Sequence, residues 1–371
     1  MRKILILMGR YLPGHKDGGP LRTIVNVTEA LGDEYEFYIA CLDRDHGDTV
    51  PYPDIVYNDW NTVGKAKVRY IEDGFTCALI KELASQVDLV YVCGFYDDYG
   101  YKTLWLNRFN KLGGKPVVVA SMGTFSRGAL SQKSFKKKVF IGLCKALGLF
   151  KKIKWSVTSS IELAEVKQNI GKKAECVIAE DLPRNNVPGR NRGEDHEQEF
   201  SVAFLSRICA HKNLDFAIKA LSHMKKNVVF NIYGPIQEQE YWDECKEMLA
   251  SVRYKWKYHG DVPSEQVQER LAENKAFIFP SKGENYGHVV FEALSVGCIP
   301  VVSDHTPWKI LDDEKSGYIL PLDEALFAST LDEIAAMKKE DRDALSDNAV
   351  MLARKKLTQS FANTGYREIF G

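Results

Sequence analysis

The chain has 371 residues, 45% of them hydrophobic and 27% charged, and its 50 basic and 50 acidic side chains give a formal net charge of zero. This composition is typical of a soluble globular protein and excludes a fibrous or disordered chain. Because no whole-molecule basic field exists, no nucleic-acid partner is expected. The length exceeds what one hydrophobic core usually serves, so two domains are expected.

The N-terminus and the cysteines indicate the compartment. The stretch MRKILILMGR has only five apolar residues after its charges, too few for a secretory signal, and no apolar run is long enough to span a membrane. The eight cysteines are scattered without a C-x-x-C pair. A zinc or redox site is therefore not expected, and free thiols fit a reducing compartment. We expect a cytoplasmic protein.

The first half of the chain alternates short apolar runs with amphipathic stretches. Several runs are uniformly apolar, which is typical of parallel strands buried on both faces. After the first run, residues 20–32 predict a helix that begins near Pro20 and ends before Gly32. The expected strands are residues 3–8, 36–42, 87–94, 115–121, 154–160 and 174–180.

Residues 181–199 interrupt this pattern with prolines, glycines and dense charge, as interdomain linkers do. A second α/β series follows. The fold class predicted is α/β, with two doubly wound Rossmann-like domains, residues 1–180 and 200–356, facing a central cleft. Ligands of such sheets bind at the carboxyl ends of the strands. The second series of expected strands is residues 200–206, 227–234, 255–262, 275–281 and 299–304.

One carboxylate, Glu292, lies inside an apolar run, eight positions after Glu284. An ionised carboxylate is costly in apolar surroundings unless donors accompany it. A helix beginning near Gly287 would offer unpaired amides to a phosphate, and Glu292, one turn beyond His288, would accept hydrogen bonds from a sugar diol. A ligand is therefore one possible partner of Glu292, and a nearby Lys or Arg is the other.

The stretch ENYGHVVFEA, in which Glu284 and Glu292 bracket seven residues, resembles the E-x7-E signature of retaining glycosyltransferases of family 4, which have the GT-B fold. Further features follow the family's order along nearly the whole chain. They are two glycines after the first strand (Gly18, Gly19), an Arg and a Lys after the first strand of the second domain (Arg207, Lys212), NIYG ending at Gly234, YHGDV with Asp261, and a closing helix at about 357–371 that would return to the first domain.

The resemblance implies a glycosyltransferase of the hexosyltransferase class (EC 2.4), moving a sugar from a nucleotide-diphosphate sugar, expected to be UDP-linked, to a glycan or lipid-linked saccharide. By resemblance, Arg207 and Lys212 would stabilise the departing diphosphate, Glu284 would contact the donor sugar, and Glu292 would hold the ribose. No metal and no cofactor are implied. The other implied donor-binding residues are Gly18, Gly19, Gly234, Asp261, Asn285, Tyr286, Gly287, His288 and Val289.

The first domain departs from the family pattern. Many members carry a His before a glycine on the acceptor side, whereas this chain has Met122 before Gly123. The stretch TFSRGALSQKSFKKK instead resembles the subset involved in cell-surface polysaccharide and glycolipid assembly, and Gly123 and Arg127 are the expected acceptor-side residues. A front-face retaining mechanism, in which the leaving phosphate receives the acceptor proton, needs no base from this domain.

Other functions were weighed against the same residues. The acidic pairs Asp43/Asp45 and Asp97/Asp98 could suggest a metal, but two carboxylates seldom hold Mg²⁺ without substrate phosphates. A nicotinamide dehydrogenase would need G-x-G-x-x-G, which GRYLPGHKDGGP lacks. A sugar-nucleotide epimerase and a non-catalytic sugar-nucleotide-binding protein stay open, and donor hydrolysis would separate the latter from both enzymes.

Residues 133–154 hold eight lysines and no acidic residue. As a helix, the segment would carry apolar side chains on one face and lysines opposite. A basic amphipathic helix can bind an anionic membrane, which would place the protein on the inner face of the plasma membrane. The alternative is that the apolar face packs on its own domain. That face consists of Phe135, Val139, Leu143, Ala146, Leu147 and Phe150.

Overall fold

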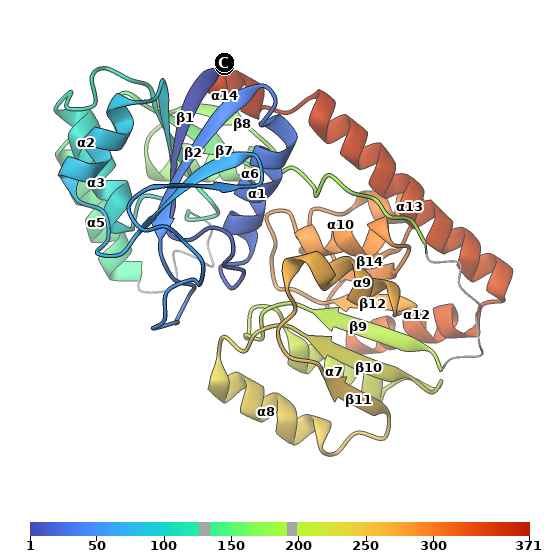
Figure 1. Cartoon of the computed structure of the whole chain (residues 1–371). Helices are drawn as coiled ribbons and strands as arrows, with labels where there is room; N and C mark the ends of the chain where they lie inside the picture. The colour runs from blue at the N-terminus through green and yellow to red at the C-terminus, as the bar shows by residue number, and fades with distance from the viewer. Residues whose placement is uncertain (126–133, 191–198) are drawn as a thin grey trace. The chain divides into compact units, whose positions relative to one another are not determined.

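The computed structural model describes residues 1–125, 134–190 and 199–371. These residues form two compact units (Figure 1). The first contains Met1–Leu182 and Ser360–Gly371, and the second contains Pro183–Gln359. Each unit is built around one sheet of mainly parallel strands. The prediction of two Rossmann-like α/β sheets is confirmed.

The first unit has an eight-stranded sheet in the order β3-β4-β2-β1-β5-β6-β7-β8. Neighbouring strands are parallel except β3, which pairs antiparallel with β4. Neither β3 nor β4 was predicted from the sequence, because Lys67 and Arg69 interrupt the apolar run of β4 and β3 is only four residues long. The strands are β1 (Arg2–Leu7), β2 (Tyr35–Leu42), β3 (Trp60–Val63), β4 (Ala66–Ile71), β5 (Leu89–Cys93), β6 (Val117–Ala120), β7 (Ile153–Val157) and β8 (Glu175–Ile178).

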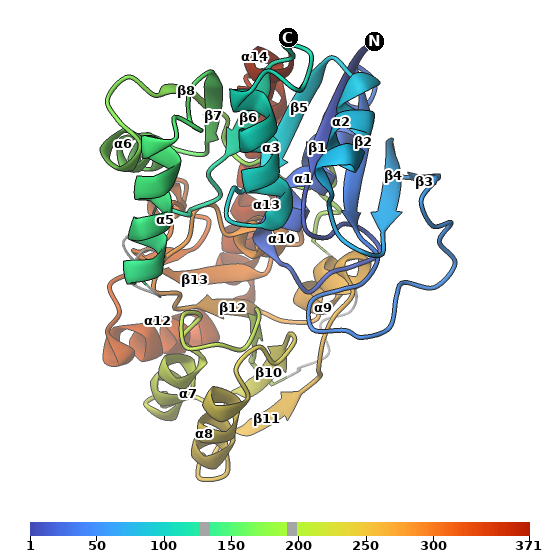
Figure 2. The ribbon, with the colours of Figure 1, turned by 90° about the vertical axis from the view of Figure 1, so that its left-hand side faces the viewer.

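Helices cover both faces of this sheet (Figure 2). Successive side chains of β1 point to opposite faces of the sheet. Ile4 and Ile6 join one apolar cluster, and Leu5 and Leu7 join the other. Burial on both faces explains why the strands have continuous apolar sequences. Helices α1 (Gly19–Leu31) and α14 (Tyr366–Phe370) pack on the first cluster, and α2 (Cys77–Ser85), α3 (Asp98–Arg108), α5 (Ser134–Ala146) and α6 (Ser160–Asn169) pack on the second.

The end of the chain, α14, packs against the first sheet. The ring of Phe370 lies 5.6 Å from that of Phe37 and 5.7 Å from that of Tyr91. Arg367 donates to both carboxylate oxygens of Glu34, at 2.8 and 2.7 Å, and this pairing lowers the pKa of Glu34. The last residues are therefore part of the first unit's core.

The second unit has a six-stranded sheet, β11-β10-β9-β12-β13-β14, in which all neighbours are parallel. The sequence analysis missed only β14, which has three residues. The strands are β9 (Ser201–Leu205), β10 (Val229–Tyr233), β11 (Lys255–Tyr258), β12 (Ala276–Phe279), β13 (Ile299–Ser303) and β14 (Tyr318–Leu320).

The helices of the second unit are α7 (Leu214–Ser222), α8 (Gln239–Leu249), α9 (Val267–Ala272), α10 (His288–Ser295), α11 (Ile310–Asp313), α12 (Glu324–Ala336) and α13 (Lys339–Ala362). A 3₁₀ turn precedes α9 at Ser264–Gln266.

The region expected as a linker, residues 181–199, contributes to both units. Asp181 and Leu182 are buried in the first unit, and the second unit begins at Pro183. Residues 191–198 lie outside the described part of the chain. Within the described part, no helix combines the length and apolarity needed to cross a bilayer.

Asp181 is a buried carboxyl between β8 and α1. The hydroxyl of Thr23 donates to its Oδ1 at 2.9 Å, and next to it Asn26 donates to the carbonyl oxygen of Leu182 at 2.7 Å. Burial is the main cause that raises the pKa of Asp181 to about 7. The folded protein therefore binds this proton more tightly than the unfolded chain does.

The Asp181→Asn variant is expected to have a flatter stability profile than the wild type. The stabilising contribution of protonated Asp181 is complete below the unfolded pKa of about 4 and is lost as pH rises through about 7. Urea unfolding at intervals from about pH 4 to about pH 8 measures the difference, with exposed Asp33→Asn as the control. Parallel wild-type and Asp181→Asn profiles would contradict the burial assigned to this carboxyl.

Candidate functional site

The turn between β12 and α10, together with the first residues of α10, holds half of the expected donor-binding residues. Gly287 precedes the helix with φ of 78°, a left-handed conformation that favours glycine, and no side chain caps the first turn. The indole Nε1 of Trp308 donates to the carbonyl oxygen of Tyr286 at 2.6 Å, which holds the turn in place. Asn285, Tyr286, His288 and Val289 therefore lie around a helix N-terminus whose amides can bind an anion.

Lys212 and Glu284 meet in the structure although 72 residues separate them in the sequence. The Lys212 ammonium donates to Oε1 of Glu284 and lies over the ring of Phe279, 5.4 Å from its centroid. The hydroxyl of Ser281 donates to the same carboxylate oxygen at 2.6 Å. Both charged side chains are nearly nine-tenths buried, so the pair is shielded from solvent.

Backbone and side-chain contacts join the two loops that carry this pair. The side chain of Asn213, in the left-handed conformation with φ of 64°, donates to the carbonyl oxygen of Pro280 at 3.0 Å. The amide of Lys282 donates to the carbonyl oxygen of His211 at 3.0 Å, and the His211 ring bonds to the carbonyl oxygen of Gly283 at 2.7 Å. The loops following β9 and β12 are thus held side by side.

The remaining expected residues of this unit follow neighbouring strands. Arg207 follows β9, Gly234 follows β10, and Asp261 follows β11. A side chain at Gly234 would place its Cβ 1.9 Å from the carbonyl oxygen of Ser206, so only glycine fits there. Beside them, the ring of His259 stacks on Tyr233, and partial burial lowers its pKa. The strand ends place Arg207, Gly234 and Asp261 along one edge of the sheet.

Glu292 has a protein partner that the sequence analysis did not identify. Nη2 of Arg184 lies 3.4 Å from Oε1 of Glu292, and both side chains are largely buried. Arg184 also donates to the carbonyl oxygen and to Oγ of Ser264, at 2.7 and 2.6 Å. Of the two possible partners, the cationic side chain is present. Arg184 was missed because it lies in the expected linker.

In the first unit, Gly18 and Gly19 open α1. Gly18 has φ of 68°, and a Cβ on Gly19 would meet no atom within 4 Å, so the backbone there is open to a ligand. At the other expected position, the amide of Gly123 donates to Oε1 of Glu162 at 2.5 Å. Arg127 lies outside the described residues.

Glu162 is a buried carboxylate that the sequence analysis missed. Besides Gly123, the amide and hydroxyl of Thr158 donate to its Oε2, at 2.6 and 2.9 Å. Ser159 caps α6, and Glu162 follows it by three residues, which is the spacing of a capping box. The sequence alone could therefore have indicated a helix start at these two residues. Glu162 joins the carboxyl ends of β6 and β7.

Two acidic pairs were considered for metal binding. Asp43 accepts from its neighbour Arg44 at 2.8 and 3.2 Å, and Asp45 accepts from the backbone amides of His15, Lys16 and His46. These carboxylates are thus already paired with protein donors. Among the described residues, no group of three or more His, Cys, Asp or Glu side chains could hold a metal ion.

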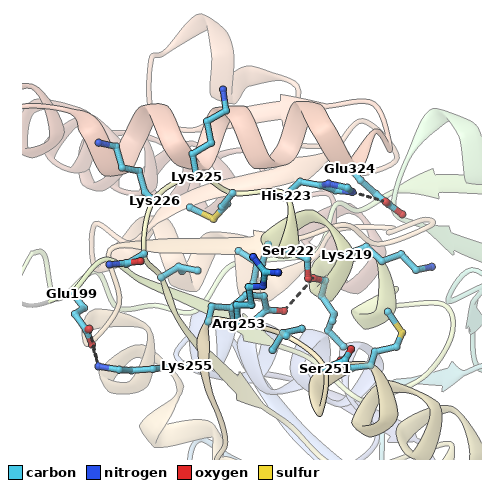
Figure 3. Close-up of a pocket in the computed structure, with 18 residues that line it drawn as sticks. Glu199, Lys219, Ser222, His223, Lys225, Lys226, Ser251, Arg253, Lys255 and Glu324 are labelled. Carbon is cyan, nitrogen blue, oxygen red and sulfur yellow. Dashed lines mark hydrogen bonds and ion pairs between the residues drawn. The ribbon is translucent and has the colours of Figure 1, made fainter.

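Each unit contains one notable cavity. In the first unit, about 480 Å³ lies at the carboxyl ends of β1, β5 and β6 and is lined in part by Met122 and Thr124. In the second, about 740 Å³ lies beside the carboxyl ends of α7 and α8, at the strand edge opposite Lys212 (Figure 3). There His223 pairs with Glu324 and Lys255 with Glu199. Cationic side chains near the carboxyl end of a helix are stabilising, which accounts for the basic side chains that line the second unit's cavity.

One known family model matches the region of the chain that contains this arrangement. Residues 190–350, which include Arg207, Lys212 and Glu284, match the family model described as glycosyl transferases group 1. The chain is a glycosyltransferase. No curated protein matches this glycosyltransferase by sequence.

Solved structures share the fold of this glycosyltransferase. The Anabaena protein HepE, solved with UDP and glucose, is 16% identical with a TM-score of 0.72, covering 98% of each chain. Sucrose-phosphate synthase from Thermosynechococcus elongatus is 15% identical with a TM-score of 0.74, covering 100% of this chain and 99% of its own. WaaG, a glycosyltransferase involved in lipopolysaccharide biosynthesis, is 12% identical with a TM-score of 0.66, covering 95% of each chain. The expected GT-B fold is confirmed.

Replacing Glu292 with Ala is expected to destabilise the second unit even without ligand. The change leaves the largely buried Arg184 without its carboxylate, which should cost about 1 to 3 kcal/mol. Urea unfolding measures the loss, and Glu269→Ala on the exposed side of α9 is the control. Equal stability of the Glu292→Ala variant and the wild type would show that the Arg184 pair contributes nothing to the fold.

Proposed function

We propose that the protein is a retaining glycosyltransferase that takes its sugar from a UDP-sugar and transfers it to a glycan or a lipid-linked saccharide. The observation that carries this proposal is the contact between Lys212 and Glu284 beside Arg207, at the carboxyl ends of β9 and β12. Structures of HepE with UDP and with UDP-glucose support the choice of UDP.

Each residue at this edge has a role in the proposed reaction. The amides at the start of α10 bind the diphosphate, and Lys212 and Arg207 stabilise the negative charge that develops as the anomeric bond breaks. Glu284, held by Lys212 and Ser281, orients the donor sugar. Glu292, whose Oε1 lies 3.4 Å from Arg184, accepts from the ribose hydroxyls. The acceptor hydroxyl oxygen bonds to the anomeric carbon on the face that the phosphate leaves, which gives retention, and the leaving phosphate takes the hydroxyl proton.

We propose that the two cations, and not a metal ion, neutralise the diphosphate. The D-x-D pair of the first unit already accepts hydrogen bonds from Arg44 and from three backbone amides. A fixed ammonium and a guanidinium at the strand edge supply the same positive charge without reorganisation.

Lys212→Ala and Arg207→Ala should each raise the activation free energy by roughly 2 to 4 kcal/mol, the scale of one preorganised donor. A panel of UDP-sugars is first screened for thermal stabilisation of the wild type, and UDP release is then measured with the best donor. Lys219→Ala, on helix α7 directly after the loop that carries Lys212 and paired with Asp215, is the matched control and should retain wild-type turnover. Near-wild-type turnover in both site variants would refute the assignment.

The proposed location is peripheral, on the cytoplasmic side of an anionic membrane, through α5. Phe135 is 79% exposed, and Val139, Leu143 and Leu147 are exposed along the same face. The side chains that α5 buries are instead Ile141 and Cys144. These four residues of the predicted apolar face therefore lie outside the first unit's core, whereas Phe150, predicted on the same face, packs against Phe95 and Trp155, with ring centroids 5.6 Å from each.

A second helix extends this surface. Tyr101, Trp105 and Phe109 are exposed at a spacing of four on α3 and the residue after it. The side chain of Asn107 reaches the carbonyl oxygens of Lys151 and Lys152, at 3.5 and 3.4 Å, so the end of α3 adjoins the loop after α5. Aromatic side chains flanked by lysines suit a bilayer interface.

Binding to liposomes is expected with anionic but not with neutral vesicles, and it should weaken with salt. Changing Lys136, Lys137 and Lys138 together to Gln should lower the affinity roughly 100-fold, because each Lys contributes about 1 kcal/mol near anionic lipid. Changing Lys225, Lys226 and Lys246 of the second unit to Gln removes the same charge and should have little effect. Equal binding to neutral and anionic vesicles would remove the membrane claim.

A further inference from the structure

The cavity of the first unit has a composition that bears on the acceptor. Its volume is about 480 Å³, and it lies where β1, β2, β5 and β6 end. Phe95, Tyr96 and Tyr99 form an aromatic wall, and Met122 lines another part. A cavity at the carboxyl edge of a parallel sheet, with aromatic and polar side chains, is the usual form of a small-molecule site in such units.

The charges in this cavity are mostly negative. Three aspartates and one arginine line it, together with His46, and its lining includes no lysine. Nη1 of the arginine, Arg10, lies 3.6 Å from Oδ2 of Asp17, whereas its buried Nε has no hydrogen-bond partner. Nδ1 of His46 also lies 3.3 Å from Asp17. Three aspartates against one arginine therefore leave the described lining of the cavity with an excess of negative charge.

Asp97 and Asp98 add the remaining negative charge at the start of α3. Asp98 pairs with Lys102 at 2.9 Å. Asp97 precedes the helix but does not cap it, and none of the described cations lies within ion-pair distance of its carboxylate. The hydroxyl of Tyr99 lies 3.1 Å from Oδ2 of Asp97. The exposed Asp97 carboxylate can therefore accept further hydrogen bonds, which sugar hydroxyls would donate.

We propose that this cavity binds the acceptor, that the acceptor is an uncharged saccharide there, and that Asp97 excludes phosphorylated sugars. The inference rests on the proposed function. A phosphate monoester carries nearly two negative charges at neutral pH, and bringing it near Asp97 and Asp98 is unfavourable. A hydroxyl in the same place donates to the carboxylates. The name of one similar structure, sucrose-phosphate synthase, includes a phosphate, so the fold alone does not decide this charge preference.

Matched sugar pairs test the charge preference. Glucose and glucose 6-phosphate, and N-acetylglucosamine and its 6-phosphate, are titrated into the full chain at low ionic strength, and binding is followed by saturation-transfer NMR. The neutral sugar of each pair should bind about tenfold more tightly than its ester. The Asp97→Lys variant should reduce or reverse that ratio, whereas Asp33→Lys, the same charge change at an exposed position of the first unit, should leave it unchanged.

Three results would overturn the inference: esters that bind as tightly as the neutral sugars, a ratio unchanged in the Asp97→Lys variant, or no binding by any of the four sugars. Stabilisation by UDP-sugars and UDP release are measured on the same samples. If these persist while the saccharide preference is absent, only this inference fails. If stabilisation and release are absent as well, the proposed function fails with it.

Discussion

Burial of both sheets on two faces is the constraint from which the rest of the structure follows. A strand covered on both sides cannot carry a charged side chain along its length, because no water remains to solvate it. In β12, Ala276 and Ile278 enter one apolar cluster and Phe277 and Phe279 the other. Polar side chains first appear where the strand ends, at Ser281 and Glu284. The chemistry of the protein is therefore concentrated at strand ends.

The same constraint explains why the residues at these ends are paired. Lys212 and Glu284 are nearly buried, and a buried charge is stable only with a partner and hydrogen bonds. The contacts of Asn213 with Pro280, and of His211 with Gly283, bring the two loops together so that each charge has its partner. A preorganised pair of this kind can stabilise charge developing on a bound diphosphate without further rearrangement.

Glu292 and Glu162 are two buried carboxylates with different protein partners. Arg184 lies 3.4 Å from Glu292 and itself donates to Ser264. Glu162 in the first unit is different, because three protein donors from Gly123 and Thr158 surround it. Its function is to hold the turn that carries Met122 and Gly123.

Local sequence determined the strands, the helix at Gly287 and the strand-end positions of Arg207, Lys212 and Glu284, because apolar periodicity and glycine placement act over a few residues. It missed β3, β4 and β14, whose alternating or short sequences resemble loops. Only the tertiary structure decided which cation accompanies Glu292, which donors surround Glu162, and that the apolar side of α5 points outward. These depend on contacts between residues as far apart as Arg184 and Glu292, and no local pattern encodes a partner at such separation. The spacing of Arg207 and Lys212 could be read from the chain, but the meeting of Lys212 with Glu284 required two loops to be folded against each other.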